Sequence, residues 1–179
     1  MAPPFTLQVL DSTSLPHDLR RRIAALCKAA YGEDLGELLA TFGPSTHVLG
    51  MLGDRLVSHA MWVTRWLQPG AAAPLETAYV EVVATHPEHQ GRGYATNVMR
   101  RLAAEIPDVY QLAALCPATP GLYARLGWRF WRGPLSIRMP SGHHLATPEE
   151  RVMVLELAGR PALNVDHPLS AEWREGEVW

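Results

Sequence analysis

Gln90-Gly91-Arg92-Gly93-Tyr94-Ala95 is the stretch of sequence that decides the fold. It follows a run of strand-forming residues, 79–84, and it opens an amphipathic helix. Glycine has no Cβ, so a turn with two glycines can bring its backbone close to a ligand. A helix that begins there directs unpaired N–H groups and the positive end of its dipole into the turn. The sequence therefore predicts an anion site, and a pyrophosphate is its natural occupant.

The segments on either side of the turn have clear apolar patterns. The helix has apolar residues at spacings of three and four until Pro107 ends it: Ala95, Val98, Met99, Leu102, Ala103 and Ile106. The strand over 77–84 is apolar on both faces, which is typical of a central, covered strand. Glu81 is the exception in this strand. A buried carboxylate needs a partner, a water or a function, so Glu81 is a candidate functional residue.

Two other phosphate-binding motifs do not fit the turn. The spacing and the lysine of a P-loop are missing, and Thr96 stands where a dinucleotide fingerprint has its third glycine. On the glycines alone, an ordinary strand-to-helix turn stays open as an alternative.

The longer string Val82–Ala95 resembles the acetyl-CoA signature of the GCN5-related N-acetyltransferases, with Gln90, Gly93 and Ala95 at its key positions. A second element, Leu122–Trp128, resembles the segment of that family in which a tyrosine lies near the coenzyme sulfur. From about Leu26 to the terminal Trp173–Trp179, the chain is similar to the aminoglycoside 2'-N-acetyltransferases within this family.

The resemblance implies the acyl-CoA N-acyltransferase fold, which is a mixed, largely antiparallel α/β sheet with splayed middle strands and helices on both faces. The alternation of strands and helices without a regular βαβ period also favours a mixed sheet. The length suits a single domain over 1–179. We expect strands over 5–10, 47–51, 56–66, 77–84, 110–115, 128–131 and 152–157, and helices after Pro16 and over 35–42 and 119–126. We expect a loop over 139–148 and an irregular tail after Gly159.

The resemblance also implies a reaction, in which an amine attacks the thioester of acetyl-CoA directly. Glu81 is then the candidate general base or amine anchor. The N–H of Val83 is the expected oxyanion donor, and Tyr123 is the expected acid toward the departing thiolate. Two alternatives stay open, because Glu81 could instead be a structural partner of Arg65 or Arg125, and Tyr123 could be an ordinary buried aromatic residue.

Coenzyme contacts are expected along the same segment. The backbone of Val83, Ala84 and Thr85 would bind pantetheine. The turn and the first helical residues would hold the pyrophosphate: Gln90, Gly91, Arg92, Gly93, Tyr94 and Ala95.

The resemblance implies a polycationic acceptor, which calls for carboxylates and other oxygen ligands. The residues that it indicates around the acceptor are Asp34, Glu81, Val82, Cys116, Glu149, Glu150 and Trp179. Two of the chain's departures from the family concern residues expected around the acceptor. Leu38 or Leu39 stands where a second acidic residue is expected, and Cys116 stands where the family commonly has serine. An N-acetyltransferase for another small amine and a non-catalytic acyl-CoA-binding sensor are therefore kept as alternatives.

Composition sets further bounds. A net charge of −2 does not favour a nucleic-acid partner. No apolar run is long enough to span a membrane and no signal peptide is evident, so we expect a cytoplasmic protein. Cys27 and Cys116 lack the spacing of a disulfide or metal motif, and we expect no metal, because the histidines lack partner ligands at metal spacing. The family implies a homodimer and a role in antibiotic resistance.

Overall fold

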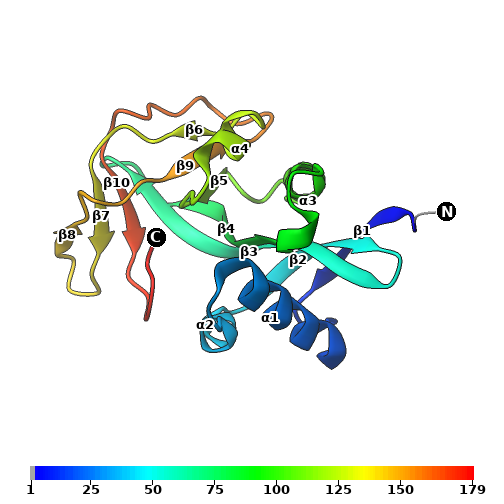
Figure 1. The fold of residues 1–179 in the computed structure, drawn as a ribbon. Coiled ribbons are helices and arrows are strands. Elements are labelled where there is room, and N and C mark those ends of the chain that lie inside the picture. Colours follow the sequence, from blue (N-terminus) through cyan, green and yellow to red (C-terminus); the bar gives the residue numbers. More distant parts are fainter. Residues whose placement is uncertain (1–2) are drawn as a thin grey trace. The chain divides into compact units, whose positions relative to one another are not determined.

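A computed structural model describes residues 3–179, which form a mixed α/β structure (Figure 1). The chain divides into two compact units, which we call the first and the second unit. The first unit comprises the chain up to Val63 together with Val80–Ile106, and the second comprises Thr64–Tyr79 together with Pro107–Trp179. Strands β3 (Arg55–Pro69) and β4 (Leu75–Thr85) contribute residues to both units.

The first unit combines an antiparallel meander with helices. Strands β1 (Phe5–Asp11) and β2 (Ser45–Leu52) pair with each other, and β2 pairs with β3. The helices are α1 (His17–Tyr31), α2 (Gly36–Thr41), the short 3₁₀ helix η1 (Pro87–His89) and α3 (Tyr94–Glu105). The sequence predicted each of these strands and α helices, with boundaries that differ by a few residues. Within residues 3–179, none of the helices has both the length and the apolar character that a membrane crossing requires.

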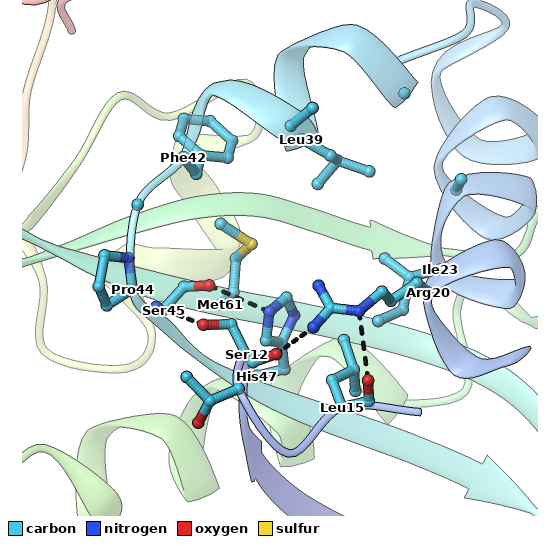
Figure 2. Close-up of a pocket in the computed structure, with 15 residues that line it drawn as sticks. Ser12, Leu15, Arg20, Ile23, Leu39, Phe42, Pro44, Ser45, His47 and Met61 are labelled. Carbon is cyan, nitrogen blue, oxygen red and sulfur yellow. Dashed lines mark hydrogen bonds between the residues drawn. The ribbon is translucent and has the colours of Figure 1, made fainter. Parts of the chain in front are cut away.

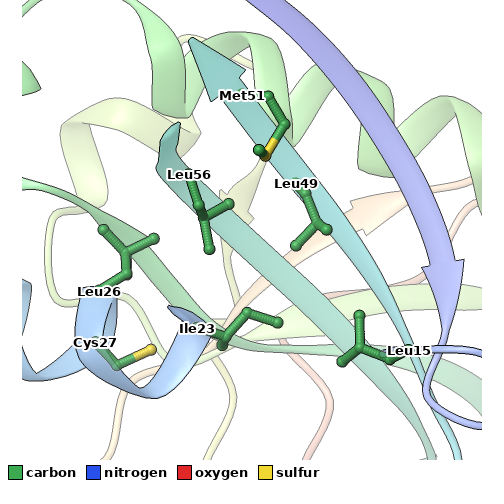
Figure 3. Packing of buried hydrophobic residues seen from close by; sticks show 8 residues of the cluster. Leu15, Ile23, Leu26, Cys27, Leu49, Met51 and Leu56 are labelled. Carbon is green, nitrogen blue, oxygen red and sulfur yellow. The ribbon is translucent and has the colours of Figure 1, made fainter. Parts of the chain in front are cut away.

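One face of the first unit's sheet is covered by α1 (Figure 3). Ile23 and Leu26, which the helical spacing predicted to face inward, are buried. They belong to a cluster drawn from α1, the preceding loop and strands β2, β3 and β4: Leu15, Ile23, Leu26, Cys27, Leu49, Met51, Leu56 and Ala84. Burial of each large side chain in such a cluster contributes about 1.5–3 kcal/mol, so α1 is held mainly by packing.

The other face carries α3, whose buried residues Val98, Met99 and Leu102 are those that the periodicity predicted. The start of α3 is fixed by a stacking contact, because the ring of Tyr94 lies 4.5 Å from that of Phe5 in β1. Gly50 makes room for this ring, since a Cβ at Gly50 would lie 3.0 Å from the Phe5 side chain. Helices therefore cover both faces of this unit's sheet, as expected (Figure 1).

The second unit is built mainly of short strands: β5 (Leu112–Leu115), β6 (Arg129–Phe130), β7 (Leu135–Arg138), β8 (His144–Ala146), β9 (Met153–Glu156) and β10 (Leu169–Glu172), with one helix, α4 (Pro120–Ala124). The strand order is β6-β9-β5-β4-β3-β10-β7-β8. The pairs β4–β5 and β10–β7 are parallel. Strand β4 pairs with β5 over Thr77–Tyr79 only and continues to Thr85 without this partner, as expected for splayed middle strands. The fold class expected from the sequence, a mixed α/β sheet, is therefore confirmed.

Two local expectations were wrong. The tail after Gly159 contains β10, which pairs with both β3 and β7. The expected loop over 139–148 contains β8, which pairs with β7. Residues Leu169–Ala171 are buried in succession, so burial does not alternate along β10. Strand β10 depends on partners that are distant in the sequence, and local periodicity does not report such pairings. Strand β8 is three residues long and exposed, so it has no buried face that an apolar pattern would mark.

The packing of Gly133 generates a prediction about stability. A Cβ on Gly133 would lie 1.9 Å from the carbonyl oxygen of His167, and the Gly133 N–H donates to the carbonyl of Val165 over 2.9 Å. The substitution Gly133→Ala must push these backbone segments apart. We expect it to lower the free energy of unfolding by about 2 kcal/mol or more, measured by urea denaturation.

Gly121→Ala is the matched control in the same unit. Gly121 lies in α4, and the nearest atom to its added Cβ is the Nη1 of Arg125 at 4.0 Å. Because alanine favours helix more than glycine does, this variant should be neutral or slightly stabilised. Equal urea midpoints for the two variants would contradict the packing described here.

Candidate active site

The double-glycine turn has the geometry that the sequence predicted. Gly91 and Gly93 adopt φ values of 73° and 80°, a conformation that favours glycine. Gly93 is the N-cap of α3, and no side chain caps this end of the helix. A Cβ on either glycine would meet nothing within 4 Å, so the backbone is accessible. The turn therefore presents the N-terminal N–H groups of α3 to a ligand, with no acidic residue in the first turn to oppose an anion.

The turn is tied back to the strands of the first unit. The side-chain amide of Gln90 donates to the carbonyl of Thr85 over 3.2 Å. Just before it, the N–H of His86 donates to the carbonyl of Val57 over 2.9 Å. The hydroxyl of Thr85 lies 2.8 Å from that of Ser58. These bonds fix the turn against β3 and the end of β4.

Charged groups around the turn are mostly cationic. Arg92 is exposed in the turn, and Arg55 bonds to Glu88 over 3.2 Å and lies 3.4 Å from the Nε2 of His86. Burial, together with the charges of Arg55 and Arg92, lowers the pKa of His89. The ligand atoms of His86, Glu88 and His89 lie within 4.8 Å of one another. Arg55 already contacts two of the three residues, and no step proposed below uses a metal there.

Strand β4 is distorted at the residue after Glu81. Val82 has a φ of 50°, and among the described residues it is the one non-glycine residue with a positive φ. A left-handed residue in a strand is typical of a β-bulge. Side chains hold the carbonyls of Val82 and of the residue after it. His59 Nδ1 lies 3.2 Å from the Val82 oxygen, and the hydroxyl of Tyr31 donates to the Val83 oxygen over 2.7 Å.

The remaining candidates of the first unit lie near this distortion or in the turn between α1 and α2. Glu81 is half-buried on β4, next to Val82. Asp34 is exposed in the turn between α1 and α2, where it accepts the N–H of Gly36 over 2.9 Å and lies 3.8 Å from the ammonium of Lys28. Ala84 is buried, and Val83 and Thr85 are half-buried, so side chains of this segment are largely covered.

The second unit brings Tyr123, Cys116 and Glu150 together. The thiol of Cys116 donates to a carboxylate oxygen of Glu150 over 3.9 Å. Burial raises the pKa of the Cys116 thiol, and the negative charge of Glu150 raises it further. Burial, with a smaller effect of Cys116, raises the pKa of Tyr123 to about 12. Tyr123 also packs edge-on against Trp128, with ring centroids 6.2 Å apart.

The tail of the second unit is held by Arg65, a buried residue of β3. Its guanidinium bonds to the Glu172 carboxylate over 2.6 Å and donates to the carbonyl of Val178 over 2.7 Å. Trp179 is buried, and its indole N–H donates to the hydroxyl of Thr147 over 2.9 Å. Glu149 is exposed in the same segment as Thr147. The tail is therefore packed into this unit by specific contacts.

A cavity of about 560 Å³ lies beside α1 and α2 in the first unit (Figure 2). Its wall is mainly apolar and includes Leu39, one of the two leucines that stand where the resemblance led us to expect a second acidic residue. Arg20 is its charged lining residue, held by the carbonyls of Ser12 and Leu15. None of the described lining residues is acidic, so we do not expect a polycation to bind in this cavity.

Three residues of these arrangements were not predicted from the sequence: Tyr31, His47 and His59. Arg65 was considered only as a possible partner of Glu81, and its bond to Glu172 was not predicted. His47 and His59 carried the one available signal, because both are polar residues within strands that otherwise read as buried. Nothing in the local sequence connected Tyr31 with Val83, 52 positions away, or Arg65 with Glu172, 107 positions away.

Comparisons with known proteins agree with this arrangement. Residues 21–131 match the family model of the GNAT acetyltransferase domain. The chain is 33% identical over 129 residues to an aminoglycoside 2'-N-acetyltransferase from Mycolicibacterium fortuitum, an alignment that covers 69% of this chain and 66% of that protein. The chain thus spans slightly less than two thirds of that curated relative.

Solved structures share the fold at low identity. The GNAT family N-acetyltransferase YhbS from Escherichia coli, in complex with CoA, has a TM-score of 0.61 and 15% identity, covering 98% of this chain and 93% of that one. Eis1 from Mycobacterium abscessus has a TM-score of 0.61 and 18% identity, covering 74% of this chain and 33% of that one. With the glycine turn, the sheet and the matched domain in agreement, the chain belongs to the GCN5-related N-acetyltransferase (GNAT) family.

Proposed function

We propose that the protein is an acetyl-CoA-dependent N-acetyltransferase that acetylates the 2'-amino group of aminoglycosides. The observation that carries the transferase activity is the open, uncapped start of α3 at the Gly91–Gly93 turn, in a chain of the GNAT family. The choice of acceptor is supported by the relative from Mycolicibacterium fortuitum, which carries that activity in its name.

In this proposal, the coenzyme binds along β4 and the turn. The N–H groups from Gln90 to Ala95 hold the pyrophosphate, and Arg92 adds a charge-assisted contact. The backbone of Val83, Ala84 and Thr85 bonds to the pantetheine arm. The hydroxyl of Tyr31 lies on the Val83 carbonyl, whose second lone pair is then the one left for the coenzyme.

The chemistry needs a base, an oxyanion donor and an acid. Glu81 accepts the proton of the attacking amine, directly or through a water. The N–H of Val83 stabilises the oxyanion of the tetrahedral intermediate, and the distortion at Val82 reorients that peptide group. The amine nitrogen forms a bond to the thioester carbon, and the carbon–sulfur bond then breaks. Tyr123, whose pKa of about 12 keeps it protonated at neutral pH, donates to the departing thiolate.

The acceptor is held by the carboxylates of Asp34, Glu81, Glu149 and Glu150, with Val82, Cys116 and Trp179 as further contacts. Each carboxylate favours a cationic amine of the acceptor.

The test is a thiol-release assay with acetyl-CoA and a panel of aminoglycosides that carry or lack a 2'-amine. We expect turnover of the compounds that carry this amine. The NMR spectrum of the product should show the acetyl group on that nitrogen. Equal turnover of compounds without it would refute the regiochemistry. Activity on simple polyamines alone would favour an N-acetyltransferase for another amine, and tight coenzyme binding with no thiol release would favour a sensor.

The base role of Glu81 predicts a pH-dependent defect. Glu81→Gln should lower kcat/KM by about a hundredfold or more near neutral pH, where the acceptor amine is protonated. The defect should shrink as pH rises through the pKa of that amine, because a free amine no longer needs the base. Glu76→Gln, on the same strand, is the control and should leave the profile unchanged. A defect of constant size across the pH range would count against the base role.

The acid role of Tyr123 predicts a loss of rate without a loss of binding. Tyr123→Phe should lower kcat by about ten- to a hundredfold, with the Kd for acetyl-CoA within about twofold of the wild-type value. Tyr110→Phe removes a hydroxyl that lies 2.8 Å from that of Thr64, and it should retain full activity. A large rise in the acetyl-CoA Kd of Tyr123→Phe would show a binding residue instead.

The Cys116–Glu150 contact predicts how the thiol reacts. Because the pKa of Cys116 is raised, its thiolate is scarce at neutral pH, and alkylation by iodoacetamide should be slow and should accelerate as pH rises. Glu150→Gln removes a negative charge, so it should lower this pKa and speed alkylation at a fixed pH, whereas Glu149→Gln should have less effect. A bound aminoglycoside should protect Cys116, and alkylation at an unchanged rate would remove Cys116 from the acceptor site.

A further inference from the structure

A chain of hydrogen bonds in the first unit runs from the cavity wall to strand β4. Ser45 Oγ lies 3.1 Å from His47 Nε2, and this first link is drawn in Figure 2. His47 Nδ1 lies 3.0 Å from His59 Nε2, and His59 Nδ1 lies 3.2 Å from the carbonyl oxygen of Val82. The two histidines come from β2 and β3, where His47 pairs with Met61 and His59 pairs with Leu49, so they are diagonal neighbours in the sheet.

The Val82 carbonyl, at the end of this series of hydrogen bonds, determines which nitrogen of each histidine carries the proton. A carbonyl oxygen can only accept, so His59 carries its proton on Nδ1 and donates it to Val82. The Nε2 of a neutral His59 must then accept, and His47 donates to it from Nδ1. His47 Nε2 is left as an acceptor, and the hydroxyl of Ser45 donates to it. The chain therefore runs in one direction, from Ser45 through both histidines to Val82.

Both histidines are suited to this neutral arrangement. His59 is fully buried and His47 is 6% exposed. Burial, and then the charge of Arg20, lowers the pKa of His47 to about 4, although Asp11 opposes the shift. Burial, and then His47, lowers the pKa of His59 to about 3, although the bond to Val82 opposes it. Neither ring gains a proton near neutral pH, so the direction of the chain is preserved.

The Val82 carbonyl belongs to the same peptide group as the Val83 N–H. In a trans peptide group the C=O and N–H bonds lie in one plane and point in opposite directions. A hydrogen bond that fixes the orientation of the C=O therefore also fixes that of the N–H. We propose that His59, held in its Nδ1–H tautomer by His47, is a positioning residue that aims the Val83 N–H at the thioester oxygen. This inference rests on the proposed acetyl transfer. The bond to His59 also polarises the peptide group, which makes the Val83 N–H a stronger donor.

Such a hold is needed because Val82 has a φ of 50°. A β-branched residue avoids this conformation, and it persists only where the surroundings enforce it. The Val82 side chain packs against the α1 cluster, and Tyr31 bonds to the next carbonyl. The bond from His59 differs from these contacts because it is made to the carbonyl of the reoriented Val82–Val83 peptide group itself.

Two polar variants of His59 separate the two ring nitrogens. The side-chain nitrogen of asparagine takes the place of Nδ1, whereas that of glutamine takes the place of Nε2. His59→Asn therefore keeps the donor to Val82, and we expect its kcat within about fivefold of the wild-type value. His59→Gln loses that donor, and we expect kcat to fall by about ten- to a hundredfold with the KM for acetyl-CoA unchanged within about twofold. Equal kcat values for the two variants would overturn the proposal.

Two spectroscopic measurements do not depend on the acceptor. In the wild-type protein, the ring ¹⁵N shifts should show Nδ1–H tautomers for both His47 and His59 from about pH 6 to about pH 8. An Nε2–H tautomer of His59 would overturn the proposal even if the variants failed to fold. With [1-¹³C]acetyl-CoA bound, the carbonyl resonance should lie less downfield in His59→Gln than in His59→Asn, because its oxygen accepts a weaker hydrogen bond.

These outcomes distinguish the inference from the proposed function. If the wild-type protein acetylated no amine, the proposed function would fail, while the ¹⁵N spectrum would still show whether His59 donates to Val82. If the wild-type protein were active and His59→Gln kept both its kcat and its ¹³C shift, the positioning role would fail and the acetyltransferase would stand.

Discussion

The left-handed conformation of Val82 is the constraint on which the candidate site depends. A valine in this region costs on the order of 1–3 kcal/mol, and a strand normally avoids it. Here the cost is offset by packing against the α1 cluster and by hydrogen bonds to the carbonyls of Val82 and Val83. All of these contacts come from the α1 face of the sheet or from α1 itself. That helix is therefore part of the machinery that shapes β4, and it does more than cover the core.

The opposite face of the first unit's sheet positions the Gly91–Gly93 turn. Phe5 stacks on Tyr94 at the first residue of α3, and Gly50 leaves the space that this ring occupies. The helix start is thereby fixed by packing, which leaves its N–H groups uncapped and accessible. The exposed cations Arg55 and Arg92 add to the positive end of the helix dipole.

Local patterns predicted the helices, the longer strands and the glycine turn, because each depends on spacing within a short stretch of chain. The distortion at Val82 could not be predicted in this way, since valine is among the residues least suited to a positive φ. Strand β10 was missed because its burial comes from pairing with β3 and β7, far away in the sequence. The His47–His59 pair was missed because the β2–β3 register alone makes the two rings neighbours.

The buried histidine pair shows why such groups can be worth their cost in stability. Two aliphatic side chains would fill the same space without the desolvation of four ring nitrogens, and cores generally tolerate such replacements when volume is kept. An aliphatic core has no direction, however, and it could not orient the Val82–Val83 peptide group. A fully satisfied series of hydrogen bonds does have a direction, because the Val82 carbonyl at its end determines where every proton lies. In the proposed acetyl transfer the Val83 N–H must be oriented, and this requirement accounts for polar residues where stability alone would favour apolar ones.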